Sequence, residues 1–163
     1  MKKIYILLGG NLGDRAYFLR KSIKEISQKI GKILKKSSIY ESKSWGFSSE
    51  KNFLNQVILI NSNLSPYKLL ECSKKIEKKL GRIKKSKDKI YENRTIDIDI
   101  LFYENEIIND ENLQIPHKLL HKRKFTILPL CEIAPKLYHP LLKKNIENIL
   151  KDCKSNEEIT IYN

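Results

Sequence analysis

The chain has 163 residues, of which 40% are hydrophobic, and a formal net charge of +13. This length and apolar content predict one domain, residues 1–163, around a single hydrophobic core. The longest apolar runs, Ile4–Leu8 and Val57–Ile60, fall far short of the roughly 18 residues that a membrane span requires, so we expect no membrane partner.

Most of the positive charge comes from lysine, and the lysines are spread along the chain. This even spread favours a compositional bias, rather than a nucleic-acid-binding surface, as the explanation of the charge. Only five arginines occur, and three of them, Arg82, Arg94 and Arg123, lie in or beside the motifs that carry chemistry. The three cysteines form no CxxC pair and cannot all join in disulfides. This predicts reduced thiols in a cytoplasmic protein and argues against zinc.

The first part of the chain predicts a strand, a helix and two more strands. Ile4–Leu8 is a short apolar run ended by glycines, which is typical of a buried strand. Asp14 can cap a helix whose apolar side chains recur at helical spacing as far as Gly31. Segments 33–42 and 53–62 are rich in β-branched and apolar residues, which predicts two strands that pair with each other.

A second helix and a fourth strand follow, separated by a polar stretch. Ser65-Pro66 opens the helix and Gly81 closes it. Residues 82–94 are rich in lysine and poor in apolar residues, which predicts a mobile surface loop able to act as a lid. Thr95–Phe102 alternates isoleucine with aspartate, the pattern of a strand with one buried face.

After the fourth strand, the sequence predicts a short hairpin around residues 104–108, a third helix over residues 122–131, and a tail without an assigned role. Pro129 falls inside that helix, where proline is poorly tolerated. The order β-α-β-β-α-β with an added helix predicts an α+β fold of the ferredoxin-like sandwich type. In such a fold, a mostly antiparallel sheet has helices packed on it, and we expect them on one face.

The most informative pattern is the pair Asp97 and Asp99. Residues two apart on a strand point to the same face, so the two carboxylates share one face of the predicted strand. They repel each other unless a cation lies between them, and Mg²⁺ suits such a pair because phosphate oxygens and water complete its shell. A solvated edge strand explains the same pattern equally well.

The surroundings of the pair favour metal-bound phosphate. Arg94 precedes it and Arg82 lies across the predicted lid, and arginine offers a planar fork of donors to phosphate oxygens. A closing loop would also exclude water, which competes as an acceptor. The segment 9–13 lacks the lysine and hydroxyl of a Walker loop, so we interpret it as a tight turn from strand to helix.

Six short motifs follow one another along the chain between residue 4 and about residue 140. They are Tyr5–Arg15, Phe53–Val57, Leu80–Arg82, Arg94–Phe102, Ile115–His117 and Pro129–Pro135. In sequence, order and spacing this set resembles the 6-hydroxymethyl-7,8-dihydropterin pyrophosphokinase family. A set of ordered motifs is far more specific than any one of them.

The resemblance implies that Asp97 and Asp99 hold two Mg²⁺ ions, which bridge the phosphates of the co-substrate ATP and the substrate hydroxyl. Arg82 and Arg94 would contact the transferring phosphates as catalytic residues. The nucleotide contacts that the resemblance implies are Glu77, Lys85, Arg94, Ile100, His117 and Arg123. Without the family context, Glu77, His117 and Arg123 would be interpreted as ordinary surface or packed residues.

A pterin is a flat heterocycle with a donor and acceptor edge, so its site needs ring faces and an amide or main chain. The pterin site that the resemblance implies consists of Ser42, Trp45, Gly46, Phe53, Asn55 and Phe125. The loop of residues 42–46 resembles the family segment that supplies main-chain contacts to the pterin. Lys43 and Ser44 replace the prolines that are typical of that segment. Phe53 stands where many relatives have tyrosine, which keeps the stacking surface and removes a hydroxyl.

The reaction that follows is attack of the pterin hydroxymethyl oxygen on the β-phosphorus of ATP, giving AMP and the pterin pyrophosphate in folate biosynthesis. We expect ATP and hydroxymethyl-dihydropterin as partners, no nucleic acid, and a monomer. One alternative is a basic RNA-binding module, but no RNP-like aromatic string is present and the acidic pair would repel RNA. Another is an inactive relative that acts as a scaffold, against which the retained carboxylates and arginines argue.

Overall fold

The computed structural model describes residues 1–82 and 92–163. The strands of the main sheet are β1 (Lys2–Gly10), β2 (Lys32–Lys36), β3 (Tyr40–Ser42), β4 (Phe53–Ser62), β5 (Asp97–Tyr103) and β10 (Ile159–Ile161). Their order across the sheet is β10-β3-β4-β1-β5, with β2 also paired to β4. All of these pairs are antiparallel, so the predicted sheet type is confirmed.

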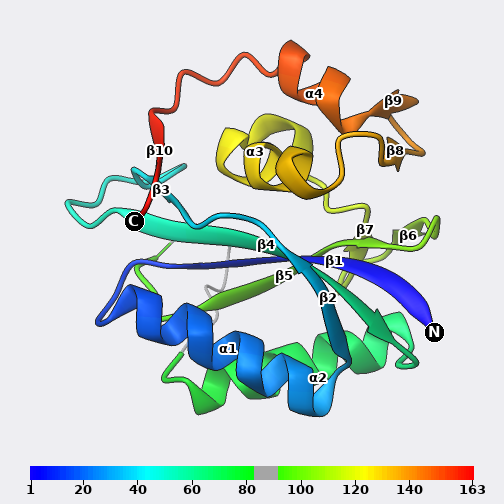
Figure 1. Cartoon of the computed structure of the whole chain (residues 1–163), viewed down its shortest axis with the longest axis horizontal. Coiled ribbons are helices and arrows are strands. Elements are labelled where there is room, and N and C mark those ends of the chain that lie inside the picture. Colours follow the sequence, from blue (N-terminus) through cyan, green and yellow to red (C-terminus); the bar gives the residue numbers. More distant parts are fainter. Residues whose placement is uncertain (83–91) are drawn as a thin grey trace.

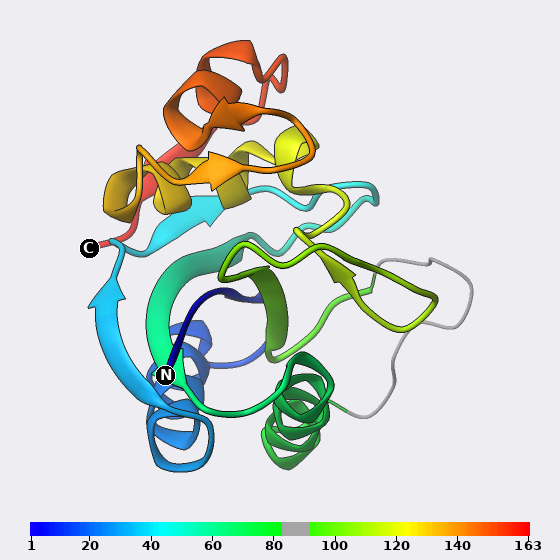
Figure 2. The ribbon, with the colours of Figure 1, turned by 90° about the vertical axis from the view of Figure 1, so that its right-hand side faces the viewer.

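Helices cover both faces of this sheet (Figure 1). The helices α1 (Arg15–Lys29) and α2 (Pro66–Lys79) lie on one face, and α3 (Lys124–Ile133) and α4 (Ile146–Asp152) lie on the other. Figure 2 shows the same three layers after a quarter turn. The expectation that the helices share one face is therefore wrong. In the described part of the chain, none of the helices has the length and apolar character that crossing a bilayer requires.

The central strands need cover on both sides because they are apolar on both faces. Ile6 and Leu8 of β1 pack into a core cluster with Leu19 of α1 and other residues of α1 and α2. Leu7 points the opposite way and packs with Ile127 and other residues of α3 and α4. Successive side chains of a strand point to opposite faces, so a continuous apolar run buries both of them.

The starts of the first two helices follow from local side-chain caps. The side chain of Asp14 accepts a hydrogen bond from the backbone N–H of Tyr17 at 2.8 Å, so α1 begins at Arg15. Ser65 caps α2 in the same way, and Pro66 occupies its first turn, where no N–H donor is required. Both predicted helices are confirmed, as is the predicted strand over residues 53–62.

Two other predictions are wrong in detail. Segment 33–42 forms β2 and β3 rather than one strand. They separate at Ser37, whose hydroxyl accepts a hydrogen bond from the N–H of Val57 at 3.0 Å and interrupts the backbone ladder. The hairpin lies later than residues 104–108, because Glu104 has a φ of 48° and only turns the chain. The paired strands are β6 (Ile108–Asn109) and β7 (Gln114–Ile115).

The last third of the chain adds elements that the sequence left without a role. A 3₁₀ turn at Leu120–Lys122 leads into α3, which begins two residues later than predicted and continues past the buried Pro129. A small sheet of β8 (Tyr138–His139) and β9 (Lys144–Asn145) precedes α4. The chain then returns to the main sheet, where β10 pairs with β3.

Candidate active site

A cavity on the α3 side of the sheet gathers most of the predicted site residues. It lies over neighbouring strands β4, β1 and β5, next to the start of α3. Its lining consists of Leu7, Gly9, Ser42, Lys43, Trp45, Phe47, Phe53, Asn55, Arg94, Asp97, Asp99, His117, Arg123 and Phe125.

Strand register explains how the polar residues meet. Asn55, Gly9 and Asp97 lie in one row across β4, β1 and β5, and Leu7 and Asp99 are partners in the adjoining row. Cross-strand partners present their side chains on one face, so both carboxylates share one face of β5, as predicted, and that face borders the cavity. A Cβ atom at Gly9 would lie 2.8 Å from Oδ1 of Asn55. The glycine therefore leaves the floor open between the amide and the carboxylates.

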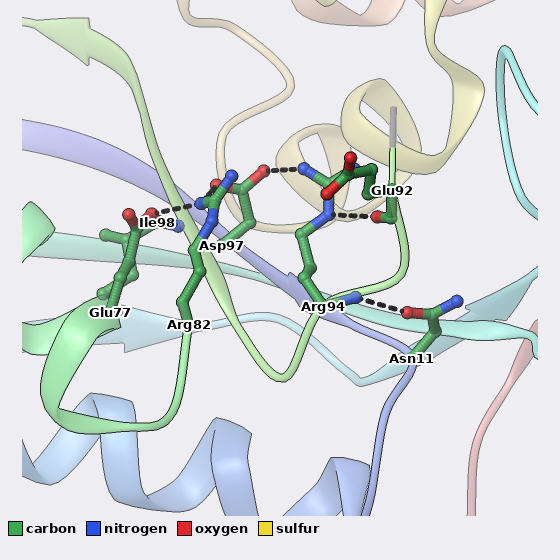
Figure 3. Close-up of polar contacts among 7 residues, drawn as sticks. All are labelled: Asn11, Glu77, Arg82, Glu92, Arg94, Asp97 and Ile98. Carbon is green, nitrogen blue, oxygen red and sulfur yellow. Dashed lines mark hydrogen bonds and ion pairs between the residues drawn. The ribbon is translucent and has the colours of Figure 1, made fainter. Parts of the chain in front are cut away.

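Two arginines hold Asp97 (Figure 3). Nη1 of Arg94 lies 2.8 Å from one carboxylate oxygen of Asp97, and Nη1 of Arg82 donates to the other. Burial alone would raise the pKa of Asp97, but the charges of Arg82 and Arg94 outweigh it and lower the pKa. This carboxylate therefore stays ionised, with both guanidinium groups held beside it.

Glu77 supports Arg82 from α2. Its Oε1 accepts a hydrogen bond from the N–H of Ile98 at 2.8 Å and lies 2.9 Å from Nη1 of Arg82 (Figure 3). Burial and the nearby charge of Asp97 raise the pKa of Glu77. The structure thus places Glu77 behind the arginine, where it orients the guanidinium group.

Asp99 has a different environment from Asp97. Burial raises the pKa of Asp99, and the charge of Asp97 raises it further. His117 lies on the same cavity wall, and its Nδ1 accepts a hydrogen bond from the N–H of Leu119 at 3.2 Å. Burial lowers the pKa of His117, so a neutral imidazole lies beside the carboxylates.

Aromatic rings form the side walls of the cavity. The guanidinium carbon of Arg94 lies 5.7 Å from the ring centroid of Phe53. On the α3 side, the guanidinium carbon of Arg123 lies 4.7 Å from the centroid of Trp45, and Trp45 packs edge-on against Phe125 at 6.5 Å. A flat ligand between these walls would meet ring faces on both sides.

Asn55 is the polar residue of the cavity floor that suits an amide-like edge. It is buried, and its Nδ2 donates to the hydroxyl of Ser42 at 3.1 Å. This bond fixes the amide plane. Its carbonyl oxygen points to the side of Gly9, where a ligand donor can reach it.

A family model for 7,8-dihydro-6-hydroxymethylpterin-pyrophosphokinase (HPPK) matches residues 5–135. The chain belongs to this family. Two similar proteins are named 2-amino-4-hydroxy-6-hydroxymethyldihydropteridine pyrophosphokinase. The protein of Aquifex aeolicus is 42% identical over 156 residues, which cover 93% of this chain and 95% of that protein. The protein of Porphyromonas gingivalis is 38% identical over 141 residues, 86% of this chain and 95% of its own length.

The HPPK fold is also found in solved structures. A crystal structure described as HPPK-DHPS in complex with substrates matches with a TM-score of 0.73 at 15% identity. The match covers 93% of this chain and 43% of that chain, so the present chain spans less than half of the solved one. At this identity the likeness concerns the fold alone, and it confirms the predicted ferredoxin-like α+β sandwich.

Some predicted HPPK site residues do not line the cavity. Ile100 packs into the core on the face shared by α1 and α2, so only its main chain can meet a nucleotide. Gly46 lies in the β3–β4 loop with a φ of 79°. Lys85 and most of the predicted lid fall outside the described residues. Conversely, the lining includes Leu7, Gly9 and Phe47, which sequence reasoning did not assign to the site.

Asn11, which the sequence suggested was only a turn residue, joins two loops next to the cavity. Its Nδ2 donates to Oδ1 of Asn93 at 2.7 Å and to the carbonyl of Lys51 at 3.3 Å. Its Oδ1 accepts a hydrogen bond from the N–H of Arg94 at 2.9 Å (Figure 3). Asparagine after two glycines at a strand end was the available signal, because its side chain readily bonds nearby backbone.

The carboxylate pair fits a Mg²⁺ ion that shares its coordination with a nucleotide. Among residues 1–82 and 92–163, no group of three or more His, Cys, Asp or Glu side chains could enclose a metal by itself. Asp97 and Asp99 offer oxygen donors, and Mg²⁺ usually completes its octahedron with phosphate oxygens and water. Burial and the charge of Asp97 both raise the pKa of Asp99, and a cation bound between the two carboxylates would offset their repulsion.

Proposed function

We propose that this chain transfers a pyrophosphoryl group from ATP to 6-hydroxymethyl-7,8-dihydropterin, giving AMP and the pterin pyrophosphate in folate biosynthesis. The observation that carries the proposal is the single cavity that joins Asp97 and Asp99 to a buried amide and aromatic walls. Membership of the HPPK family supports the same reaction.

The aromatic half of the cavity would bind the pterin. Phe53 and Phe125 offer ring faces for stacking, and Asn55 offers a donor and an acceptor to the pterin edge. Ser42 orients Asn55, and Trp45 completes the loop wall, with Gly46 providing the turn that follows it. In this position the hydroxymethyl group would point toward the carboxylates.

The charged half would bind the phosphates. Two Mg²⁺ ions, held by Asp97 and Asp99, would supply charge neutralisation and alignment of the reacting oxygens. Arg82 and Arg94 can turn from Asp97 to the phosphate oxygens, where charge develops in the transition state. His117, Arg123 and the main chain of Ile100 would hold the rest of the nucleotide, with Glu77 acting through Arg82 and Lys85 acting from the predicted lid.

We also propose that the enzyme acts in the cytoplasm. The three cysteines are free thiols, which is consistent with a reducing cytoplasm. We propose that residues 1–163 act as one domain and as a monomer.

The test is a product assay. The protein is incubated with Mg²⁺, ATP labelled at the γ-phosphate, and 6-hydroxymethyl-7,8-dihydropterin. We expect AMP that depends on the pterin, with the label transferred to the pterin product. A 6-methyl-dihydropterin, which lacks the attacking hydroxyl, is the matched control and gives no AMP. Labelled pterin together with ADP, or AMP that forms without pterin, would contradict the proposal.

A further inference from the structure

A segment near the C-terminus, residues 155–161, contacts the start of α3 and pairs with β3, and we call it the strap. It contains β10, which lies beside β3 in Figure 1. The strap lies outside residues 5–135, which match the family model, so family membership assigns it nothing. Its contacts connect the start of α3 to the end of β3.

On the α3 side, the strap caps the helix that carries two wall residues. Oε2 of Glu157 accepts a hydrogen bond from the backbone N–H of Lys124 at 2.9 Å and another from the hydroxyl of Ser155. Lys124 is the first residue of α3, so its N–H has no acceptor within the helix. A carboxylate at this end also interacts favourably with the helix dipole. Because Lys124 lies between Arg123 and Phe125, Glu157 fixes the backbone of both.

On the opposite side, the strap pairs with the strand that leads into the pterin loop. Ile159 is the ladder partner of Ser42, whose hydroxyl accepts the hydrogen bond from Asn55. Only two residue steps separate Glu157 from Ile159, and extended chain covers about 7 Å in that distance. The strap therefore limits how far the start of α3 can move from the end of β3.

We propose that the strap sets the width of the pterin pocket and that Glu157 is a positioning residue for Phe125 and Arg123. The inference rests on the proposed pterin pyrophosphokinase function. Without Glu157, the start of α3 loses its cap, and Phe125 moves away from Trp45 in the aromatic wall that the two rings share. Arg82 and Arg94 make no contact with the strap in the described residues, so phosphate binding depends on it less than pterin binding does.

The kinetic test compares Glu157→Ala with Glu158→Ala. Glu158 is the neighbouring carboxylate, and its only ion pair in the described chain is a 4.0 Å contact with Lys43 in which both side chains are at least 80% exposed. Such a pair contributes little. We expect Glu157→Ala to raise the KM for the pterin about fivefold, the equivalent of one lost helix cap, with a smaller change in kcat. Glu158→Ala leaves KM unchanged, and Glu157→Gln, which keeps an acceptor oxygen, restores it.

A second readout needs no turnover. Trp45 is the sole tryptophan of the chain, so acrylamide quenching of its emission reports directly on the wall that it shares with Phe125. We expect stronger quenching in Glu157→Ala than in the wild type or Glu158→Ala. If Glu157→Ala does not fold, Glu157→Asp, one methylene shorter, gives the same comparison.

The outcomes separate the two proposals. A lower melting temperature with wild-type KM and wild-type quenching would mean that Glu157 only stabilises the fold, and the positioning role would be rejected. Equal effects at Glu157 and Glu158 would reject it as well. If the wild type makes no pterin product, the proposed function fails, and the quenching comparison alone decides whether the strap sets the wall.

Discussion

Asp97 and Asp99 lie two residues apart on β5, yet they have different neighbours. Arg82 and Arg94 lower the pKa of Asp97, whereas burial and the charge of Asp97 raise the pKa of Asp99. The alternating sequence was sufficient to predict that both face one cavity, because strand period fixes that property. It could not predict the difference, because Arg82 comes from the end of α2 and only the packing of that helix brings it to Asp97.

At the residue scale, we predict that Asp99→Asn separates stability from activity. Ionised Asp99 opposes folding at neutral pH, since its folded pKa is raised, and the neutral amide removes that cost. Without Mg²⁺, the melting temperature of Asp99→Asn should therefore rise above that of the wild type. Pterin pyrophosphorylation should fall about a thousandfold.

Thermal melts with and without Mg²⁺ and ATP check this prediction. Asp152→Asn, at an exposed ion pair on α4, is the matched control and should change neither quantity. A lower melting temperature for Asp99→Asn in the absence of metal would show that its carboxylate is satisfied in the free protein.

At the scale of helices and strands, the predictions from the sequence agree with the structure where neighbouring residues determine the start or end of an element. Asp14 and Ser65 cap the helices that their positions predicted. Prediction from the sequence failed where an element depends on a partner far away in the sequence. Ile161 of β10, near the C-terminus, pairs with Tyr40 of β3, and no local pattern indicates this pairing. Nor does any local pattern state which face of the sheet a helix covers, so the helix that became α3 was expected on the wrong face, and α4 lies in the tail that the sequence left without a role. The aromatic wall at Trp45 and Phe125 depends on that placement.

Gly10, at the end of β1, and Gly31, after α1, form a matched pair of glycines. Alanine substitutions at the two positions test whether close backbone packing at the end of β1 positions a residue of the cavity. A Cβ on Gly10 would lie 2.2 Å from the carbonyl oxygen of Thr95, and one on Gly31 would lie 2.0 Å from that of Asn61. Both alanine variants should lose about 2 kcal/mol of folding free energy, because the added Cβ atom would clash with a backbone carbonyl group that cannot move aside as a flexible side chain can. Only Gly10→Ala should also lower kcat/KM, because it displaces the segment that carries Arg94.

Denaturant titrations and steady-state kinetics of the folded fraction distinguish the two effects. An equal loss of kcat/KM in both variants would mean that activity follows global stability rather than the position of Arg94.

The contact between α1 and α2 should depend on pH. Glu25 of α1 lies 2.8 Å from Lys29 and 2.6 Å from Lys79 of α2, and hydrogen bonds from both lysines lower its pKa to about 2. A depressed folded pKa adds stability that is complete above the unfolded value and is lost as the pH falls toward 2. Glu25→Gln should therefore be less stable than the wild type at pH 7, and the difference should shrink below about pH 4.3. A difference that stays constant across this range would assign the effect to packing.

At the scale of the whole molecule, the two faces of the sheet differ in role: the face under α1 and α2 forms a hydrophobic core, and the face toward α3 carries the cavity. All of the cavity-lining side chains lie outside the core cluster that α1 and α2 cover, and Leu7 and Phe125 belong to the opposite cluster or pack against it. Substitutions under α1 and α2 therefore act on stability first, whereas substitutions around α3 act on ligands directly.

The net charge of +13 leads to a prediction about salt. ATP is anionic and the pterin is neutral, so only ATP is attracted by the cationic surface and by the arginines of the cavity. Raising NaCl from about 50 mM to about 500 mM should increase the KM for ATP severalfold, because screening shortens the reach of these charges. The KM for the pterin is the internal control and should stay within about twofold. A parallel rise of both values would point to a change in the protein itself.

The two arginines on Asp97 also bear on inhibitor design. Because Asp97 already pairs with both Arg82 and Arg94 in the free protein, an anionic compound that arrives without a metal must compete with ion pairs formed inside the same chain. A compound that binds Mg²⁺ offers Asp97 a new counter-ion and releases both arginines for its own anion. Inhibitors of this chain should therefore combine a pterin-like ring with a metal-chelating group rather than with a simple negative charge.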